Sequence, residues 1–384
     1  MPAIYLDYNA TTPLDPAVVD AMLPFLQTHF GNPSSTHEYG RKAHDAVEQA
    51  RGEVAALMGA QPEEIVFTGG GTEASNHALK GAVFARLQGV FGRFFGTIAT
   101  PHIITCAIEH PATLQPCDFL RRLGCSVTIL PVDRQGIVDP DAIRRALTKR
   151  TAIVSIMHAN NEVGTLQPIR EIAHLAKSHG ALMHTDAAQS LGKLPVDVKE
   201  LGVDMLTLAG HKLYAPKGIG ALFVRRGIQL EPVLHGAGHE SGRRAGTENV
   251  PYIVGLGKAC AIARQSFPKA TQRLRELRDR LWNALRSTLG DKVVLNGDAE
   301  RRLPNTLNVC FVGQVGADLL QRVPEVAAST GSACHEGQIS QSPVLCAMRV
   351  PPEIGKGAVR LSVGRFTTEE EVDRAAAALA HVTK

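Results

Sequence analysis

The sequence contains no uninterrupted apolar run that approaches the roughly 18 residues a membrane-spanning helix requires. Its opening stretch, MPAIYLDYNATTPLD, has no basic region followed by an apolar run, so we expect no targeting signal. Long blocks of like charge are also missing, and 41 basic against 37 acidic residues leave a net charge of only +4. We therefore expect neither a nucleic-acid partner nor a membrane partner.

The cysteines show no organised pattern. There are seven, an odd number, and none forms a CxxC pair, which argues against a disulfide framework and against a structural zinc site. Widely spaced thiols of this kind are typical of a reduced, cytoplasmic enzyme. We expect a cytoplasmic protein without a metal site. The cysteines stand at positions 106, 117, 125, 260, 310, 334 and 346.

Short β-branched runs alternate with helix-like stretches, such as 169–178, over the first two thirds of the 384 residues. This alternation predicts α/β units built on a mainly parallel sheet. The predicted strands are 64–68, 102–106, 127–130, 152–157, 181–186, 204–208 and 220–224.

The pattern changes after about residue 255. Leucines recur at spacings of three and four within 269–289, which predicts an amphipathic helix. Short strands around 306–311 and 358–363 and a C-terminal helix from Thr368 are predicted to follow. This part of the sequence indicates a second, smaller α+β domain.

A glycine-rich turn, TGGGTE at 68–73, follows the first predicted strand and precedes a helical pattern. Glycines let the backbone approach an anion, and a helix N-terminus offers free N–H groups to a phosphate. The turn also fits a loose dinucleotide-binding pattern, but the acidic residue expected about 20 positions later is missing. No Gly-Lys pair followed by Ser or Thr marks a Walker loop. An ordinary strand-to-helix turn is the alternative.

Two charged residues mark the ends of other predicted strands: Asp186 is the last residue of 181–186, and Lys212 lies just beyond 204–208. Asp186 stands at the sheet edge where functional residues of open α/β folds gather, and a buried carboxylate there needs a cationic partner unless it caps a helix. Lys212 could form a Schiff base if it is desolvated near other cations, although a single lysine is usually a solvated surface group. A phosphate loop, an aspartate and a lysine in this order are what a fold type I pyridoxal-phosphate (PLP) enzyme would use.

Cys334 lies in STGSACHEG at 329–337, among small, polar and turn-forming residues. This composition predicts an exposed thiol on a mobile loop at about 329–343. The neighbouring His335 would favour the thiolate. The other cysteines lie mostly in apolar runs and are interpreted as small core residues. An incidental or buried cysteine is the alternative for Cys334.

The sequence resembles the cysteine desulfurase family, of the nitrogen-fixation and iron–sulfur-cluster type, nearly from end to end. The resemblance rests on specific motifs that occur in the family's order: YLDYNATTPL, FGNPSSTHEYGR, FTGGGTEASN, AIEHPA, HANNEVGTLQPI, HTDAAQSLGK, AGHKLYAPKGIGAL, GRRAGTENV, RLPNT, GSACHEG and RLSVGR.

This resemblance implies a role for each matching residue. Lys212 would bind PLP as a Schiff base and take the α-proton of L-cysteine, while Asp186 would pair with the pyridinium nitrogen. Cys334 would receive the sulfur as a persulfide, and alanine would leave. The further implied contacts are His110 on the ring and in proton transfer, Asn161 and Gln189 at the ring hydroxyl, Gly71, Thr72, His211 and a second subunit's Thr247 on the phosphate, and Arg360 on the substrate carboxylate, helped by Asn161 and Asn32.

The resemblance also implies an architecture: the type I PLP fold, an active site shared across a homodimer, and a sulfur-acceptor protein such as an iron–sulfur scaffold. We expect a large PLP-binding domain at 15–255. A small domain would combine 1–14 with 256–384 and carry the nucleophile loop.

Three departures from the family pattern matter. Ala209 stands where many members place a serine on the phosphate, which predicts one phosphate contact fewer. The phenylalanine-rich segment 87–97 has no clear counterpart; we interpret it as a surface loop, with a partner-docking patch as the alternative. Cys334-His335, with SPVL at 342–345, is similar to selenocysteine lyases.

Selenocysteine lyase is therefore the alternative activity within the same fold. A nicotinamide dehydrogenase is disfavoured by the missing ribose-binding acid, and a non-catalytic sulfur relay would not need Lys212.

Overall fold

The computed structural model describes residues 3–91, 100–330 and 341–383. Its larger part is built on a sheet of seven strands, five of which run parallel, from β4 through β3, β5 and β6 to β7. The strand β8 is antiparallel to both of its neighbours, β7 and β2. The predicted mainly parallel α/β sheet is confirmed. Across the sheet the strands are β2 (Ile65–Thr68), β8 (Gly220–Val224), β7 (Met205–Ala209), β6 (Leu182–Asp186), β5 (Thr151–Ser155), β3 (His102–Cys106) and β4 (Ser126–Leu130).

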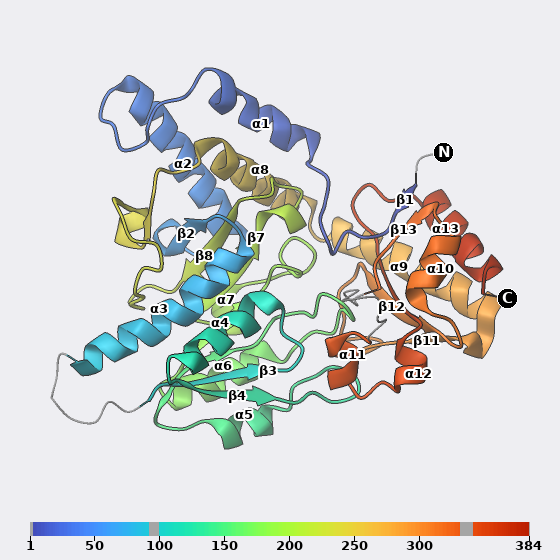
Figure 1. The fold of residues 1–384 in the computed structure, drawn as a ribbon. Helices are drawn as coiled ribbons and strands as arrows, with labels where there is room; N and C mark the ends of the chain where they lie inside the picture. Colours follow the sequence, from blue (N-terminus) through green and yellow to red (C-terminus); the bar gives the residue numbers. More distant parts are fainter. Residues whose placement is uncertain (1–2, 92–99, 331–340, 384) are drawn as a thin grey trace.

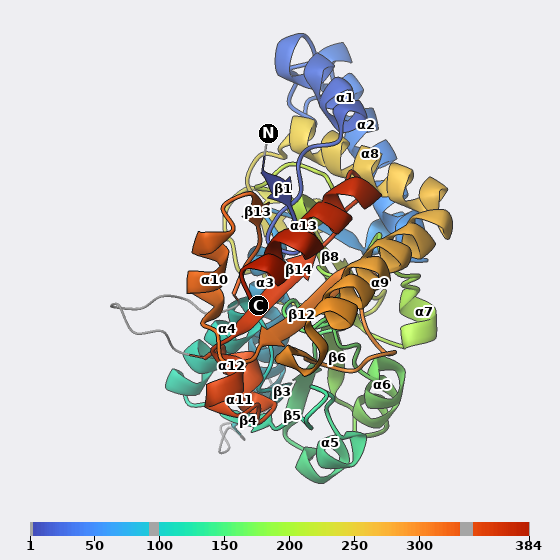
Figure 2. The same ribbon diagram turned by 90° about the vertical axis from the view of Figure 1, so that its right-hand side faces the viewer.

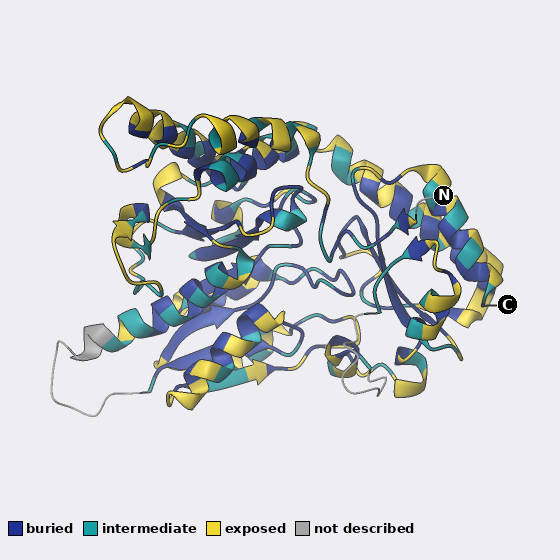
Figure 3. Cartoon of the chain, turned by 45° about the horizontal axis from the view of Figure 1, so that its top comes forward, coloured by how far each residue is buried: buried dark blue, intermediate teal, exposed yellow. Residues whose placement is uncertain are grey.

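Helices cover both faces of this sheet, as Figures 1 and 3 show. Alternate residues of β3 point to opposite sides: Ile103 packs in the core beneath α3 and α4, whereas Ile104 joins the core formed with α2, α6 and α8. Both faces are buried, which is why the strands appear in the sequence as continuous apolar runs. The helices of this part are α1 (Pro16–Gln27), α2 (Glu38–Leu57), α3 (Gly71–Phe91), α4 (Pro111–Arg122), α5 (Pro140–Ala146), α6 (Ile169–Ser178), α7 (Val198–Leu201) and α8 (Val250–Ser266). A short hairpin pairs β9 (Gly238–His239) with β10 (Arg244–Ala245).

The smaller part has its own core, between a three-stranded antiparallel sheet and the helices α9 and α13 (Figure 2). The N-terminal strand β1 joins it by pairing in parallel with β13, and Ile4 and Leu6 are buried there. Its elements are β1 (Ile4–Tyr5), α9 (Lys269–Leu289), β11 (Val293–Leu295), β12 (Thr306–Phe311), α10 (Gly316–Arg322), β13 (Val326–Ala327), α11 (Pro343–Ala347), α12 (Pro352–Gly355), β14 (Ala358–Ser362) and α13 (Glu369–His381).

The helix-like stretch 169–178 and the amphipathic helix predicted at 269–289 are found with these bounds, as α6 and α9. In α9 the predicted leucines, including Leu277 and Leu281, face the core of the smaller part. The helix α13 begins where predicted, because Thr368 and Glu371 form a capping box at its first turn.

Helix α8 was not predicted, and it runs across the predicted boundary at residue 255. Its buried residues, up to Ala263, belong to the core of the larger part, and the second core begins at Leu274 on α9. We therefore propose that the division between the domains follows α8 and lies between these two residues.

Two predicted segments fall partly or wholly beyond the described residues. The segment 87–97 was interpreted as a surface loop, but its first residues form the end of α3, which continues to Phe91; positions 92–99 lie outside the described residues. Most of the nucleophile loop, 331–340, lies outside them as well. Among the residues that are described, no helix is both long and apolar enough to span a bilayer.

Candidate active site

A cavity of about 410 Å³ opens at the carboxyl edge of the parallel sheet. One wall follows the ends of β3, β6 and β7, and the opposite wall comes from the N-terminal segment and β14. Its volume suits a small organic cofactor or substrate. The predicted residues that line it together are Gly71, Thr72, His110, Asn161, Asp186, Gln189, His211, Lys212 and Arg360.

Lys212 enters the cavity from a short 3-10 helix, Gly210–Lys212, that directly follows β7. Its ammonium group donates to the backbone carbonyls of Asn9 and Ala10, at 2.5 and 2.7 Å. Burial, together with the charge of the nearby Arg360, lowers the pKa of Lys212 to about 8, although Asp186 and Asp7 oppose this shift. A lysine with this pKa is partly neutral near neutral pH, so it can attack an aldehyde.

Asp186 closes the strand β6 and is 8% exposed. One of its carboxylate oxygens accepts the N–H of Ala188 at 2.9 Å. Burial raises the pKa of Asp186, while this hydrogen bond and the charges of His110 and Lys212 oppose the rise. Within the described chain it forms no salt bridge. A cation placed in the cavity would stabilise such a carboxylate, and the protonated pyridine nitrogen of PLP is a cation of this kind.

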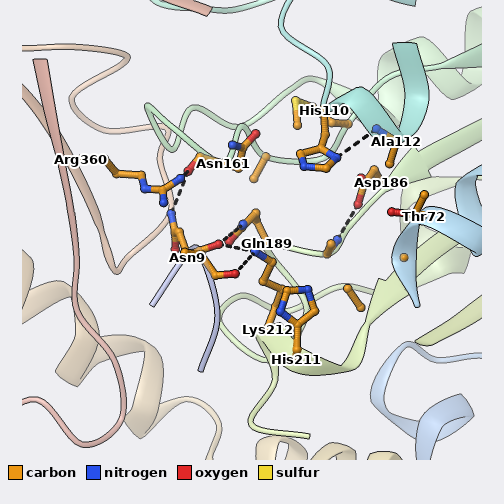
Figure 4. Close-up of a pocket in the computed structure, with 16 residues that line it drawn as sticks. Asn9, Thr72, His110, Ala112, Asn161, Asp186, Gln189, His211, Lys212 and Arg360 are labelled. Atoms are coloured by element: carbon orange, nitrogen blue, oxygen red, sulfur yellow. Dashed lines mark hydrogen bonds between the residues drawn. The ribbon is translucent and has the colours of Figure 1, made fainter. Parts of the chain in front are cut away.

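His110 precedes α4 and caps it, since its Nδ1 accepts the N–H of Ala112 at 3.1 Å. A neutral imidazole that accepts at Nδ1 carries its proton on Nε2. Burial lowers the pKa of His110, Asp186 opposes this effect and Lys212 adds to it. The ring lies at the cavity beside Asp186 (Figure 4), so it can contact an aromatic ring and exchange a proton through Nε2.

The glycine-rich turn brings the first turn of α3 against the end of β7. A Cβ atom on Gly71 would lie only 3.1 Å from the Cβ of Ala209, so this close approach favours a glycine. The N–H of Gly69 is already donated to the Glu73 carboxylate at 2.7 Å. A phosphate at this end of the cavity would therefore meet the free N–H groups at the start of α3.

The side chains around this end are neutral donors. Thr72 and His211 line the cavity, and His211 Nδ1 lies 3.2 Å from the hydroxyl of Thr11. Burial, together with the charge of the adjacent Lys212, lowers the pKa of His211 to about 4. Ala209 contributes no hydroxyl. The residues present thus fit a bound phosphate through hydrogen bonds.

Arg360 stands on β14 in the opposite wall. Its guanidinium donates to Asp7 Oδ1 at 2.7 Å and to the backbone carbonyl of Asn161 at 3.1 Å. The other oxygen of Asp7 accepts the hydroxyl of Ser329 at 3.1 Å. These contacts hold a cation at the edge of the cavity, where it can bind the carboxylate of an amino acid.

Asn9, which was not predicted, lies between the two walls and is 1% exposed. Its backbone carbonyl accepts from Lys212 and from the Gln189 amide, and its side-chain oxygen accepts from Lys193 and Asn305. The signal for it was present in the motif YLDYNATTPL, where a polar residue follows an apolar strand.

Glu109, also not predicted, is a buried acid directly before His110. It accepts the N–H of Met157 at 2.6 Å and the thiol of Cys106 at 3.1 Å. Burial raises the pKa of Glu109 to about 8, so its carboxyl group is largely protonated at neutral pH. A single acid in the otherwise mostly apolar AIEHPA was the available signal.

Two predicted residues do not reach this cavity. Thr247 lines a separate hollow together with Arg244 and Glu248, and Asn32 is an exposed residue whose side chain accepts the N–H of Ser34.

Most of the cysteines cannot act as nucleophiles in this fold. Five are buried, and burial raises the pKa of each thiol, to about 12 for Cys117. Their prediction as core residues is confirmed, while Cys346 is exposed. Cys334 and His335 lie outside the described residues. The buried cysteines are Cys106, Cys117, Cys125, Cys260 and Cys310.

Comparisons with known proteins agree with this geometry. The family model of the class-V aminotransferases matches residues 4–375. The chain is 46% identical over 372 residues to a cysteine desulfurase IscS of Dictyoglomus turgidum, which covers 96% of this chain and 92% of that protein. It is 49% identical over 378 residues to a cysteine desulfurase of Gluconacetobacter diazotrophicus, with 97% and 92% covered.

Solved structures of similar proteins have the same fold as this chain. A NifS-like protein superposes with a TM-score of 0.89 at 35% identity and covers 99% of both chains. A structure described as SspA in complex with cysteine superposes with a TM-score of 0.80 at 36% identity, covering 95% of this chain and 99% of the other.

Proposed function

Because this chain belongs to the class-V aminotransferase family and is a PLP-dependent cysteine desulfurase, we propose that the cavity described above is its active site. The observation that carries the proposal is the convergence of Lys212, Asp186 and Arg360 on one cavity. A nucleophilic amine, a carboxylate that needs a cation and a guanidinium for a substrate carboxylate are the three groups this chemistry requires.

The residues would divide the reaction as follows. Arg360 binds the carboxylate of L-cysteine and orients the amino acid, and the amine of Lys212 takes the α-proton. Asp186 keeps the pyridine nitrogen protonated, and PLP, when bound, supplies the electron sink for this proton loss. His110 exchanges a proton at Nε2 beside the ring.

Cys334 completes the reaction in this proposal. Its thiolate attacks the sulfur of the substrate, so that an S–S bond forms while the C–S bond breaks and its electron pair stays with the substrate carbon. That carbon is protonated and leaves as L-alanine, and the persulfide remains on Cys334. The activity of the relatives supports desulfuration of L-cysteine over selenocysteine lysis.

The test is alanine release from L-cysteine by the purified protein and by Cys334→Ala, with L-selenocysteine in parallel. We expect the variant to keep bound PLP but to lose persulfide formation and alanine release. Cys346→Ala is the matched control, because Cys346 is the exposed thiol among the described residues. A persulfide found on another cysteine would contradict the role of Cys334, and release from L-selenocysteine that survives in Cys334→Ala would favour the lyase.

We also propose a homodimer in the cytoplasm that passes its sulfur to an acceptor protein such as an iron–sulfur scaffold. Thr247 and Asn32 do not reach the cavity of their own chain, which supports a role for them in the site of a second copy. Five buried, unpaired thiols are compatible with a reducing compartment.

A further inference from the structure

Lys193 is a buried lysine that the proposed reaction does not use. It follows β6 by seven residues in the motif HTDAAQSLGK and is 7% exposed. Its ammonium donates to the side-chain oxygens of Gln189, at 3.0 Å, and Asn9, at 3.3 Å. Within the described part of the chain it has no carboxylate partner. Burying a lysine head group against two amides is costly, so its position calls for an explanation.

The contact with Lys193 determines how the Gln189 amide is oriented. Burial and the charges of Lys212 and Arg360 lower the pKa of Lys193 to about 7. The ammonium form, which prevails below that pH, can only donate hydrogen bonds, so it requires the oxygen of Gln189 to face it. The Gln189 nitrogen then lies on the other side, where it donates one N–H to the backbone carbonyl of Asn9 at 3.0 Å. The described residues offer no acceptor for its second N–H, and Gln189 lines the cavity.

Asn9 is held in the same way. Its side-chain oxygen accepts from Lys193 and Asn305, while its side-chain nitrogen donates to Thr306 Oγ1 at 2.8 Å. Its backbone carbonyl is thereby fixed as the shared acceptor of Gln189 and Lys212. One buried lysine head group thus contacts the side chains of both Gln189 and Asn9, two residues that Figure 4 shows at the cavity.

We propose that Lys193 is a positioning residue for the cofactor: it holds the Gln189 amide so that an N–H group points to the ring of bound PLP. This inference rests on the proposed assignment of the cavity and of Gln189 to PLP. It adds a residue that acts through Gln189 and does not itself contact the cofactor.

The experiment is a double-mutant cycle on PLP affinity, with Lys193→Met, Gln189→Leu and the double variant. Methionine keeps the unbranched chain and removes the N–H donors. The backbone carbonyl of Lys193, which accepts from the Thr271 hydroxyl at 2.8 Å, is unchanged, so this link to α9 remains. Apoprotein is titrated with PLP while its visible absorption band is followed. Lys199→Met, at an exposed position, is the matched control.

We expect Lys193→Met to weaken PLP binding roughly tenfold, as the loss of one or two buried hydrogen bonds implies. The loss in the double variant should be clearly smaller than the sum of the two single losses, because Lys193 acts on the cofactor mainly through the Gln189 amide. Wild-type affinity in Lys193→Met, or losses that add in the double variant, would overturn the inference.

Two further outcomes are considered: a Lys193→Met protein that does not fold, and a Gln189→Leu protein that binds PLP normally. If Lys193→Met does not accumulate as folded protein, Lys193→Gln, which retains an NH2 donor group, is used in the same cycle with a smaller expected loss. If Gln189→Leu itself binds PLP normally, the role of Gln189 and this inference both fail. A visible band that depends on Lys212 would still support the assignment of the cavity, so the two failures are distinguishable.

Discussion

The two walls of the cavity are built in different ways. The sheet wall carries Asp186, His110 and Lys212 at or just beyond the carboxyl ends of parallel strands. Burial shifts the pKa of each toward its neutral form. The opposite wall carries Arg360, which is held by an ion pair with Asp7, a residue 353 positions away in the sequence.

This difference separates two tasks. A neutral amine and a neutral imidazole are what proton transfer and attack on an aldehyde require. Recognition of a substrate carboxylate instead requires a permanent cation in a fixed place, which an ion pair can provide. The sheet wall is therefore suited to chemistry and the opposite wall to binding, and each prediction below tests one side of this contrast.

The largest effect is expected for Lys212→Ala. In the proposed reaction Lys212 is both the amine that binds PLP and the base that takes the α-proton, so the visible absorption of the bound cofactor should disappear in this variant. Alanine release should fall by roughly 10³-fold or more, within the range for loss of an acid–base group. Lys199→Ala, an exposed lysine, is the control. An unchanged visible band would remove Lys212 from the active site.

The sheet wall was the part that the sequence predicted. Apolar runs define the strands. Asp186 ends one of them and Lys212 lies just beyond another, so their meeting at one edge follows from parallel topology. Helix α8 was missed because apolar and small residues occur on all of its sides; Gly255, Gly257 and Ala259 pack in the interior as leucines do elsewhere.

The opposite wall could not be predicted from local pattern. Nothing in the sequence near Asp7 indicates that it will meet Arg360, since this contact depends on the packing of β1 beside β13 and β14. The same holds for Lys193, whose neighbours in the sequence do not show that its head group turns inward to Asn9. Asp7 and Lys193 both lie in motifs of the family, but a motif does not indicate which residues its members contact.

The pKa of Lys212 gives a second test of the sheet wall. When the pKa of a lysine is lowered from 10.5 to about 8, most of its molecules carry a neutral amine above pH 8. An ordinary lysine is still charged at that pH. The rate at which apoprotein binds PLP should therefore rise about tenfold between roughly pH 7 and 9 and then level off. Stopped-flow absorbance measures it. A rate that keeps rising toward the pKa of a solvated lysine would show that burial does not neutralise this amine.

The smallest effect is expected from the opposite wall, in Asp7→Asn. The substitution keeps the shape of the side chain and removes the charge that holds the Arg360 guanidinium, so the arginine should become less well placed for the substrate carboxylate. Loss of one charge-assisted hydrogen bond predicts a KM for L-cysteine that is higher by roughly fivefold to tenfold. Because Asp7 does not take part in proton transfer, kcat and the visible band should stay near their wild-type values.

Arg280→Gln, which breaks an exposed ion pair with Asp373 on the outer surface, is the matched control for simple loss of a salt bridge. A fall in kcat without a change in KM would mean that the two walls do not divide chemistry from binding.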